Sequence, residues 1–296
     1  MDQIQIFPAQ KAPEKPYFSI LIPSWNNLAF LQLCIRSIRT HSVVPFELIV
    51  HLNEGKDGSL QWVQDQGDIA YSYSETNVGV CHAMNAMRTL ARADYLLYIN
   101  DDMYTLPGWD LLLKQEIEAC SDEYFFISST MIEPRAQSSC SIEANFGTSM
   151  SSFEESRLLA EYQSFEKPDW QGATWPPNVV HKKLWDAVGG YSVEFTPGMY
   201  SDPDFSMKLW QAGVRLFKGL GQSRVYHFGS ISVKRVKQNR GYYQFIRKWG
   251  MTSSTLSTYY LRRGERFDGP LVLQHIPLLV RLKNWYYRIS TARKII

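Results

Sequence analysis

The sequence predicts an α/β fold with a mostly parallel central sheet, helices on both faces and a C-terminal helical extension. In the first 100 residues, short apolar runs alternate with stretches of helical periodicity, as in parallel strands joined by crossover helices. Charge also divides the chain. Residues 1–233 hold 17 Lys and Arg against 27 Asp and Glu, whereas residues 234–296 hold 14 against two. An acidic body and a basic C-terminal region are therefore expected.

Four apolar runs predict buried strands, at residues 18–22, 46–50, 69–73 and 95–99. Pro23 is expected to end the first of them. Helical spacing of apolar residues follows three of the runs, over residues 28–38, from Leu60 onward and over residues 80–92. Asn26 or Asn27 is expected to cap the first helix.

The pattern is looser after Trp109. Residues 121–180 combine one strand-like run at 124–127 with loop sequence, and residues 181–217 are helix-like on both sides of a turn. Two or three helical segments, interrupted by Gly and Pro, are expected over 241–296. We therefore divide the chain into an N-terminal extension (1–16), a catalytic domain (17–233) and a basic, aromatic C-terminal helical region (234–296).

Parallel strands joined by crossovers bind ligands beyond their carboxyl ends. The segments that follow residues 22, 50, 73 and 99 should therefore converge on one site. Asn100, Asp101 and Asp102 directly follow the fourth strand. Adjacent carboxylates at such a place suit Mg²⁺ or Mn²⁺, which in turn bind a diphosphate. The alternative for the pair is an acidic turn or a helix cap.

A second group of carboxylates lies at Asp202 and Asp204. Asp204 precedes a helical stretch, so it is expected to cap that helix. Pro203 would keep Asp202 off the helix, free to act as a general base towards a sugar hydroxyl. The alternative for Asp202 is an ordinary turn residue. His227 is suited to be a further metal ligand beside a carboxylate, or else is a structural histidine.

With these residues in view, the sequence resembles the family 2 glycosyltransferases over roughly residues 17–232. The resemblance rests on six ordered pieces and not on one motif. They are Ile20-Leu-Ile-Pro23 with Asn26, the turn at residues 53–59, Asn77-Val-Gly79 with Asn85, Asn100-Asp-Asp102 with residues 107–109, residues 188–191, and Ser201-Asp-Pro-Asp204. It implies the GT-A fold, which is Rossmann-like and binds nucleotide sugars.

The resemblance also implies roles for particular residues. Donor-binding positions would be Pro23, Ser24, Asn26, Asn53, Asn77, Gly79, Asn85, Asn100 and Asp101. Asp102 would hold the metal, with His227 as the additional ligand that some members use. Asp202 takes the position of the catalytic base, and Asp204 that of an acceptor-side or capping residue. Asn53 departs from the usual Asp, which leaves the base of the donor nucleotide open.

The expected reaction is inverting transfer of a sugar, assisted by Mn²⁺ or Mg²⁺. The donor would be UDP-, dTDP- or GDP-linked, and the acceptor a hydroxyl of a glycan or lipid-linked molecule in cell-surface polysaccharide synthesis. The alternative is a catalytically silent nucleotide-sugar or glycan-binding module on the same fold. No G-x-G-x-x-G follows the first strand, which disfavours a dehydrogenase, and no nucleic-acid-binding module is recognisable.

The N-terminal residues lack a signal-peptide pattern, no apolar run reaches about 18 residues, and the four cysteines are scattered. A cytoplasmic protein is expected. Residues 270–296 mix apolar, aromatic and cationic side chains, as helices at a membrane surface do. Two interpretations stay open for this segment: docking on an anionic membrane, or packing on the catalytic domain.

Overall fold

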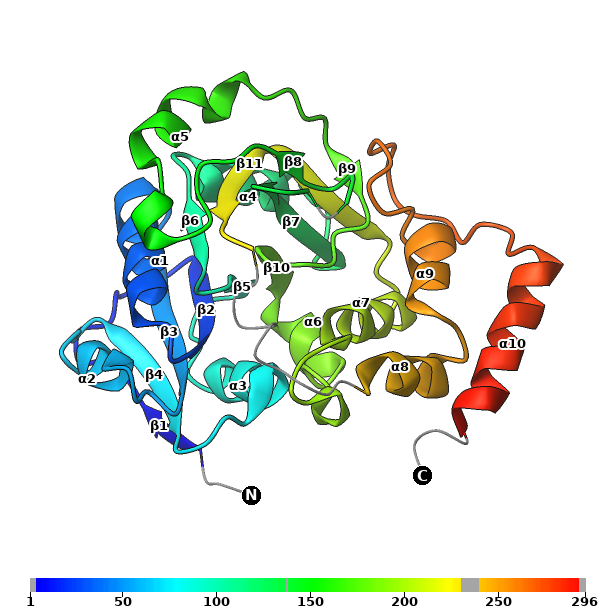
Figure 1. The fold of residues 1–296 in the computed structure, drawn as a ribbon, viewed down its shortest axis with the longest axis horizontal. Helices are drawn as coiled ribbons and strands as arrows, with labels where there is room; N and C mark the ends of the chain where they lie inside the picture. The colour runs from blue at the N-terminus through cyan, green and yellow to red at the C-terminus, as the bar shows by residue number, and fades with distance from the viewer. Residues whose placement is uncertain (1–3, 137, 230–239, 293–296) are drawn as a thin grey trace.

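A single sheet of eleven strands, counted among the described residues, runs through the molecule (Figure 1). The computed structural model describes residues 4–136, 138–229 and 240–292. The strand order is β1-β4-β3-β2-β5-β10-β7-β11-β6, with β8 beside β7 and β9 beside β11. The strands are β1 (Gln5–Phe7), β2 (Phe18–Trp25), β3 (Phe46–Asn53), β4 (Ile69–Ser74), β5 (Tyr95–Tyr98), β6 (Met103–Thr105), β7 (Phe125–Glu133), β8 (Ile142–Glu143), β9 (Trp170–Gln171), β10 (Asn178–His181) and β11 (Leu216–His227).

The first half of the sheet is parallel, as predicted. Strands β4, β3, β2 and β5 pair in parallel, and β1 adds an antiparallel edge strand to β4. The connecting helices are α1 (Leu28–His41), α2 (Ser59–Gln64) and α3 (Gly79–Arg88). Beyond β5 the sheet is mixed, because β10 is antiparallel to both of its neighbours, whereas β11 is parallel to β7.

The prediction that Pro23 ends the first strand was wrong. Strand β2 continues to Trp25, and Pro23 lies opposite His51 of β3. The backbone carbonyl of Leu21 accepts from the N–H of Ile99, so the backbone groups of Leu21 point to the β5 side. Pro23 lies two residues further along the strand, and its backbone groups therefore point to the same side. Pairing with β5 has already ended at Leu21, and the missing N–H of Pro23 therefore leaves no ladder bond unmade.

Helices cover both faces of the sheet, which confirms the predicted layering. On one face α1 and α4 (Trp109–Ala119) bury Leu31, Ile35 and Leu113 against the strands. On the other face α3, α6 (Lys182–Ala187) and α7 (Ser201–Gln211) contribute residues such as Met84 and Phe205. A third cluster lies under α5 (Glu155–Glu161) and the short 3-10 turns on either side of it.

The C-terminal residues from 241 to 271 are built into the same body. Helix α8 (Gly241–Trp249), α9 (Ser253–Thr255) and the π-turn Leu256–Tyr260 share the core of α7, with Phe245 and Leu271 almost fully buried. Helix α10 (Leu278–Ala292) lies at the outer edge against α8 (Figure 1). Among the described residues no helix is both long and apolar enough to cross a bilayer.

Candidate active site

The predicted acidic turn lies where two parallel strands end. After β5 the chain turns through Asn100 into β6, and this turn carries Asp101 and Asp102, both buried. The Ser24 hydroxyl, near the end of β2, donates to Asp101 Oδ2 at 2.7 Å. The backbone carbonyl of Asp102 accepts from the N–H of Phe228, which follows β11. The turn is therefore fixed between three strands.

His227 is the last residue of β11 and lies opposite Met103. Its Nε2 lies 3.5 Å from Asp102 Oδ1, and its Nδ1 lies 2.8 Å from Glu133 Oε1. Burial lowers the pKa of His227, but the carboxylates of Asp102 and Glu133 outweigh burial and raise it to about 10. Glu133 ends β7, and nothing local in the sequence indicates this role, because the contact depends on β7 and β11 pairing in parallel.

A carboxylate oxygen and an imidazole nitrogen at this distance form a donor pair that suits Mn²⁺ or Mg²⁺. Glu133 on the other ring nitrogen fixes the orientation of His227, as carboxylates do behind metal-bound histidines. The two residues would therefore give a divalent cation one oxygen and one nitrogen ligand, and its other ligands would have to come from water or substrate. Within the described ranges no group of three or more His, Cys, Asp or Glu is arranged to hold a metal by itself.

Asp202 lies in the first turn of α7, so the prediction that Pro203 keeps it off the helix was wrong. The helix starts at Ser201, after Tyr200 in the left-handed region (φ 68°). A proline is tolerated in a first turn because its missing N–H has no partner there. Asp202 Oδ1 accepts from the Tyr191 hydroxyl at 2.9 Å. Burial raises the pKa of Asp202 to about 7, against the opposing effect of the Tyr191 hydrogen bond.

The prediction that Asp204 caps this helix was also wrong. Asp204 lies inside α7 and is fully buried. Its Oδ1 accepts from Trp249 Nε1 at 2.8 Å and lies 2.9 Å from Lys248 Nζ. Both partners belong to α8, so Asp204 joins the C-terminal helices to α7.

Tyr98 connects the two groups of carboxylates. Burial raises its pKa well above the usual value, and the charges of Asp202, Asp102 and Asp101 raise it further, in that order. Its ring packs edge-on against Tyr191 at 6.2 Å, and Tyr191 in turn bonds to Asp202. Tyr98, Tyr191 and Asp202 therefore form a connected series from the end of β5 to the first turn of α7.

Loops at the carboxyl ends of β3 and β4 hold three of the predicted donor-binding residues. Asn53 ends β3, and its Oδ1 accepts from the Val78 N–H at 2.8 Å. Asn77 Oδ1 accepts from the Gly79 N–H at 2.9 Å. Gly79 has φ +77°, and a Cβ there would lie 2.7 Å from Pro197 Cα. Gly79 therefore lets this loop pack directly on the loop that leads to α7.

Two other predicted residues hold neighbouring loops in place. Asn26 accepts from the Lys56 N–H and donates to Glu54, so it joins the β2–α1 loop to the β3–α2 turn. Asn85 accepts from the Tyr191 N–H at 2.9 Å and donates to the Tyr191 carbonyl at 2.8 Å, which positions Tyr191 for its bond to Asp202.

The predicted Asn cap of α1 is absent from the described structure. Asn27 occupies the N-cap position without a side-chain bond, and neither Asn26 nor Asn27 serves the helix terminus. Asp57 Oδ2 instead accepts from the Leu28 N–H at 2.7 Å. A carboxylate from the next loop therefore replaces the local cap.

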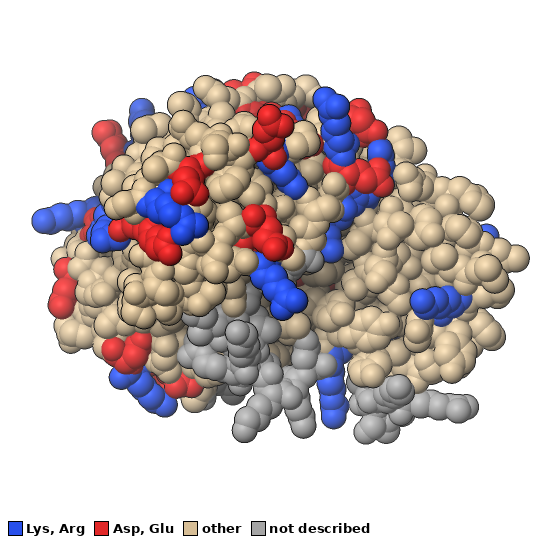
Figure 2. Space-filling model, turned by 45° about the horizontal axis from the view of Figure 1, so that its top comes forward, with Lys and Arg blue, Asp and Glu red and all other residues tan. Residues whose placement is uncertain are grey.

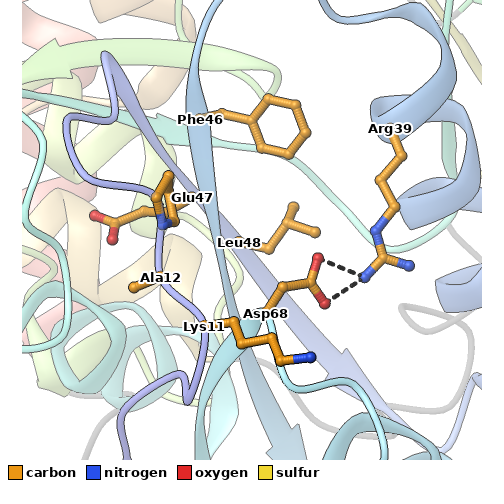
Figure 3. Close-up of a pocket in the computed structure, with 8 residues that line it drawn as sticks. Lys11, Ala12, Arg39, Phe46, Glu47, Leu48 and Asp68 are labelled. Atoms are coloured by element: carbon orange, nitrogen blue, oxygen red, sulfur yellow. Dashed lines mark hydrogen bonds and ion pairs between the residues drawn. The ribbon is translucent and has the colours of Figure 1, made fainter.

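One surface hollow of about 450 Å³ lies away from these residues (Figure 3). It is lined by Lys11, Phe46, Glu47 and the ion pair between Arg39 and Asp68. Phe46 and Asp68 lie at the amino ends of β3 and β4, roughly 20 Å along the strands from their carboxyl ends. The hollow is therefore not part of the candidate site.

Comparison with protein families gives a match to the family described as glycosyl transferase family 2, over residues 19–132. An uncharacterised protein of Mycobacterium tuberculosis is 28% identical over 109 residues, which are 36% of this chain and 34% of that protein. A "PGL/p-HBAD biosynthesis glycosyltransferase" of the same species is 32% identical over 91 residues, 29% of this chain and 36% of that protein. The chain thus spans about a third of the length of the curated relatives it matches.

Solved structures share the fold over most of the chain at low sequence identity. A crystal structure of S. aureus TarS has a TM-score of 0.57 at 13% identity and covers 94% of this chain and 72% of that one. A TarS structure in complex with UDP has a TM-score of 0.56 at 15% identity and covers 78% of this chain and 63% of that one. A TarS structure in complex with UDP-GlcNAc has a TM-score of 0.57 at 14% identity and covers 94% of this chain and 72% of that one. The fold is therefore the GT-A architecture.

Proposed function

We propose that the chain, whose residues 19–132 match glycosyl transferase family 2, works as a glycosyltransferase of that family. It would transfer a sugar, with inversion, from a nucleotide-sugar donor to a hydroxyl of a glycan or lipid-linked acceptor in cell-surface polysaccharide synthesis. Two contacts at the end of β5 carry the proposal. The Asp102–His227 pair lies at the turn that follows β5, and Tyr191 packs on Tyr98, the last residue of β5, while it bonds to Asp202. In this proposal the arrangement would supply a place for a cation and a base on the same side of the sheet.

In this proposal the donor nucleotide occupies the loops that follow β2, β3 and β4. Pro23, Ser24, Asn53, Asn77 and Gly79 contact the base and ribose. Asn26 and Asn85 shape these loops, while Asn100 and Asp101 lie towards the ribose and the donor sugar. The bound UDP and UDP-GlcNAc of the TarS structures support a nucleotide sugar as donor. UDP-, dTDP- and GDP-sugars are all to be tested.

Asp102 and His227 would hold Mn²⁺ or Mg²⁺. Such a cation, when bound, stabilises the negative charge that develops on the diphosphate leaving group. The buried Glu133 keeps the His227 ring in place by its 2.8 Å contact with Nδ1. Ser24 does the same for Asp101 by its hydroxyl hydrogen bond. These second contacts preorganise the site before substrate arrives.

Asp202 would accept the proton of the acceptor hydroxyl as that oxygen attacks the anomeric carbon. A pKa of about 7 makes Asp202 basic enough to take the proton and still ionised in part near neutrality. Tyr191, bonded to Oδ1, fixes the orientation of the carboxylate. Asp202 Oδ2 then remains for the acceptor.

Replacing Asp202 tests the proposal. We expect Asp202→Asn to lower transfer, measured by release of the nucleotide from a donor panel with Mn²⁺, by about 10²- to 10⁴-fold, because general base catalysis is lost. Asp186→Asn is the matched control, since Asp186 is an exposed carboxylate that pairs with Arg88 on the surface. Near-normal transfer by a folded Asp202→Asn protein would remove Asp202 as the base. A wild-type protein that binds donor but never releases nucleotide would instead favour a silent binding module.

A further inference from the structure

Exposed apolar side chains are concentrated near the C-terminus. Fifteen large hydrophobic residues are exposed in the described part of the chain, and eight of them lie between Val272 and Ile289. Leu279 is 79% exposed and Trp285 is 63% exposed. Solvent-exposed apolar residues scattered singly are ordinary, but a contiguous group of them marks an interaction surface.

Most of these side chains form one stripe along α10. Leu278, Leu282, Trp285 and Ile289 recur at helical spacing, with Leu279 and Tyr286 beside them. At 100° per residue the six fall within a sector of about 120°. We call this set the α10 stripe. It is a continuous apolar face on an amphipathic helix.

The opposite face of α10 is already occupied by the body of the protein. Asn284 is 8% exposed, and its Oδ1 accepts from the Thr252 N–H at 3.3 Å and the Thr255 hydroxyl at 3.1 Å. Thr291 is 1% exposed. The helix is therefore held on the body by its polar side, which leaves the α10 stripe directed away from the body.

Basic residues border the stripe on both sides. Arg281 and Arg288 lie at one edge by helical geometry and Lys283 at the other, and all three are exposed. The sequence from Gly269 to Ile296 contains no Asp or Glu. Figure 2 shows the same contrast, since mixed red and blue cover the left and the top whereas the right-hand end bears isolated blue residues and no red.

We propose that α10 docks the protein on an anionic lipid surface, with the stripe inserted at the boundary between headgroups and acyl chains. An apolar face with Trp and Tyr, bordered by cations, is the pattern of helices that lie in this boundary. Fifteen residues of helix extend about 22 Å, less than the hydrocarbon core of a bilayer, so α10 lies on the membrane and does not cross it.

A second copy of the chain fits the stripe less well. Two stripes packed about a twofold axis would bring the Arg281, Lys283 and Arg288 of each copy near the same cations of the other. The segment carries no acidic residue to pair with them. An anionic bilayer supplies the missing negative charge. Each basic residue at its surface increases the binding affinity about fivefold.

Vesicle co-sedimentation of the full chain tests the proposal. We expect the wild-type protein to bind vesicles of phosphatidylcholine with about 30% phosphatidylglycerol, and to bind pure phosphatidylcholine at least tenfold more weakly. The double variant Leu282→Ser, Trp285→Ser should lose at least tenfold in binding, because the apolar face is gone. The variant Arg281→Gln, Arg288→Gln should lose about 25-fold on the anionic vesicles alone.

The matched control is Val43→Ser, Tyr124→Ser, two exposed apolar positions on the body, which should bind as the wild type does. All three double variants change exposed side chains, and equal melting temperatures verify that they fold. Equal vesicle binding by the stripe variant and the control would overturn the proposal. So would a wild-type protein that ignores anionic vesicles and instead forms dimers that Leu282→Ser, Trp285→Ser disrupts. Neither outcome depends on sugar transfer, so the proposed function is tested separately.

Discussion

Asp202 shows how two opposing effects set the chemistry of one carboxylate. Burial in α7 raises its pKa, and the hydrogen bond from Tyr191 opposes the rise. Tyr191 is itself held by stacking on Phe205, with ring centroids 4.8 Å apart, and by both backbone bonds to Asn85. The ionisation of Asp202 thus depends on residues from α3, the loop after α6, and α7.

The pH profile of transfer should report this balance. A base must be deprotonated, so activity should rise with pH through about 7. Tyr191→Phe removes the hydrogen bond that stabilises the carboxylate, and we expect the rising limb to move up by about one pH unit. Relative to the wild type, the activity of Tyr191→Phe should be reduced most below about pH 7 and should be close to normal about two pH units higher. Tyr124→Phe, at an exposed site, is the control, and a limb that stays in place in Tyr191→Phe would contradict the account.

Single residues were also where sequence reasoning was least complete. Asp101 and Asp102 could be placed because they directly follow an apolar run whose carboxyl end must face the ligand. Glu133 could not, because its contact with His227 forms only when β7 and β11 pair. Asp204 was misplaced because the left-handed conformation of Tyr200 starts α7 earlier than the apolar pattern indicates.

At the scale of elements, the loop at residues 77–79 and the loop before α7 are packed backbone to backbone. The N–H of Val80 donates to the Pro197 carbonyl at 3.0 Å. There is no space for a side chain at position 79, because Pro197 lies against the Gly79 backbone. This contact joins the predicted donor loop to the helix that carries Asp202. The strands and helices of this region could be predicted from periodicity, but the contact between the loops depends on tertiary packing.

Gly79 and Gly108 have nearly the same backbone conformation but different surroundings. Comparing an alanine at each position therefore distinguishes the cost of backbone strain from the cost of a steric clash. At Gly79, with φ +77°, an added Cβ would lie 2.7 Å from Pro197, whereas at Gly108, with φ +80°, it would meet nothing within 4 Å. We expect Gly108→Ala to lower the free energy of unfolding by about 1 kcal/mol, from backbone strain alone. Gly79→Ala should cost about 2 kcal/mol more, because the loop must move.

Urea denaturation of the two variants measures this difference. Gly79→Ala should also weaken donor binding, since the displaced loop includes Asn77, whereas Gly108→Ala should not. Equal losses of stability in the two variants would mean that the Gly79 contact with Pro197 does not constrain the loop.

At the scale of the whole molecule, the proposed site is assembled from two distant parts of the chain. The family match at residues 19–132 includes Asp101 and Asp102 but neither Asp202 nor His227. Strand β11 brings His227 to 3.5 Å from Asp102, and the proposal requires α7 to present Asp202 at the same edge. The parallel half could be predicted from alternating runs, but the antiparallel insertion of β10 between β5 and β7 could not, because its four residues carry no distinctive pattern.

We expect one part of the C-terminal region to be required for folding and another part, helix α10, to be dispensable. Phe245, Leu256 and Leu271 are buried in the core of α7, whereas α10 touches the body through one polar face. A chain ending at Pro277 should therefore unfold cooperatively with a melting temperature within a few degrees of the full chain. A chain ending at Arg240 should show no cooperative transition by near-ultraviolet circular dichroism, because that core is uncovered. Cooperative unfolding of the shorter chain would contradict this division.

The central claim is that Asp102, His227 and Asp202 serve one site, and a crystal structure with UDP and Mn²⁺ tests it most directly. The account predicts an anomalous manganese peak bound by the Asp102 carboxylate, His227 Nε2 and the diphosphate, with the Asp202 carboxylate open to the same cleft. Manganese bound elsewhere, or protein packed between the diphosphate and Asp202, would contradict it.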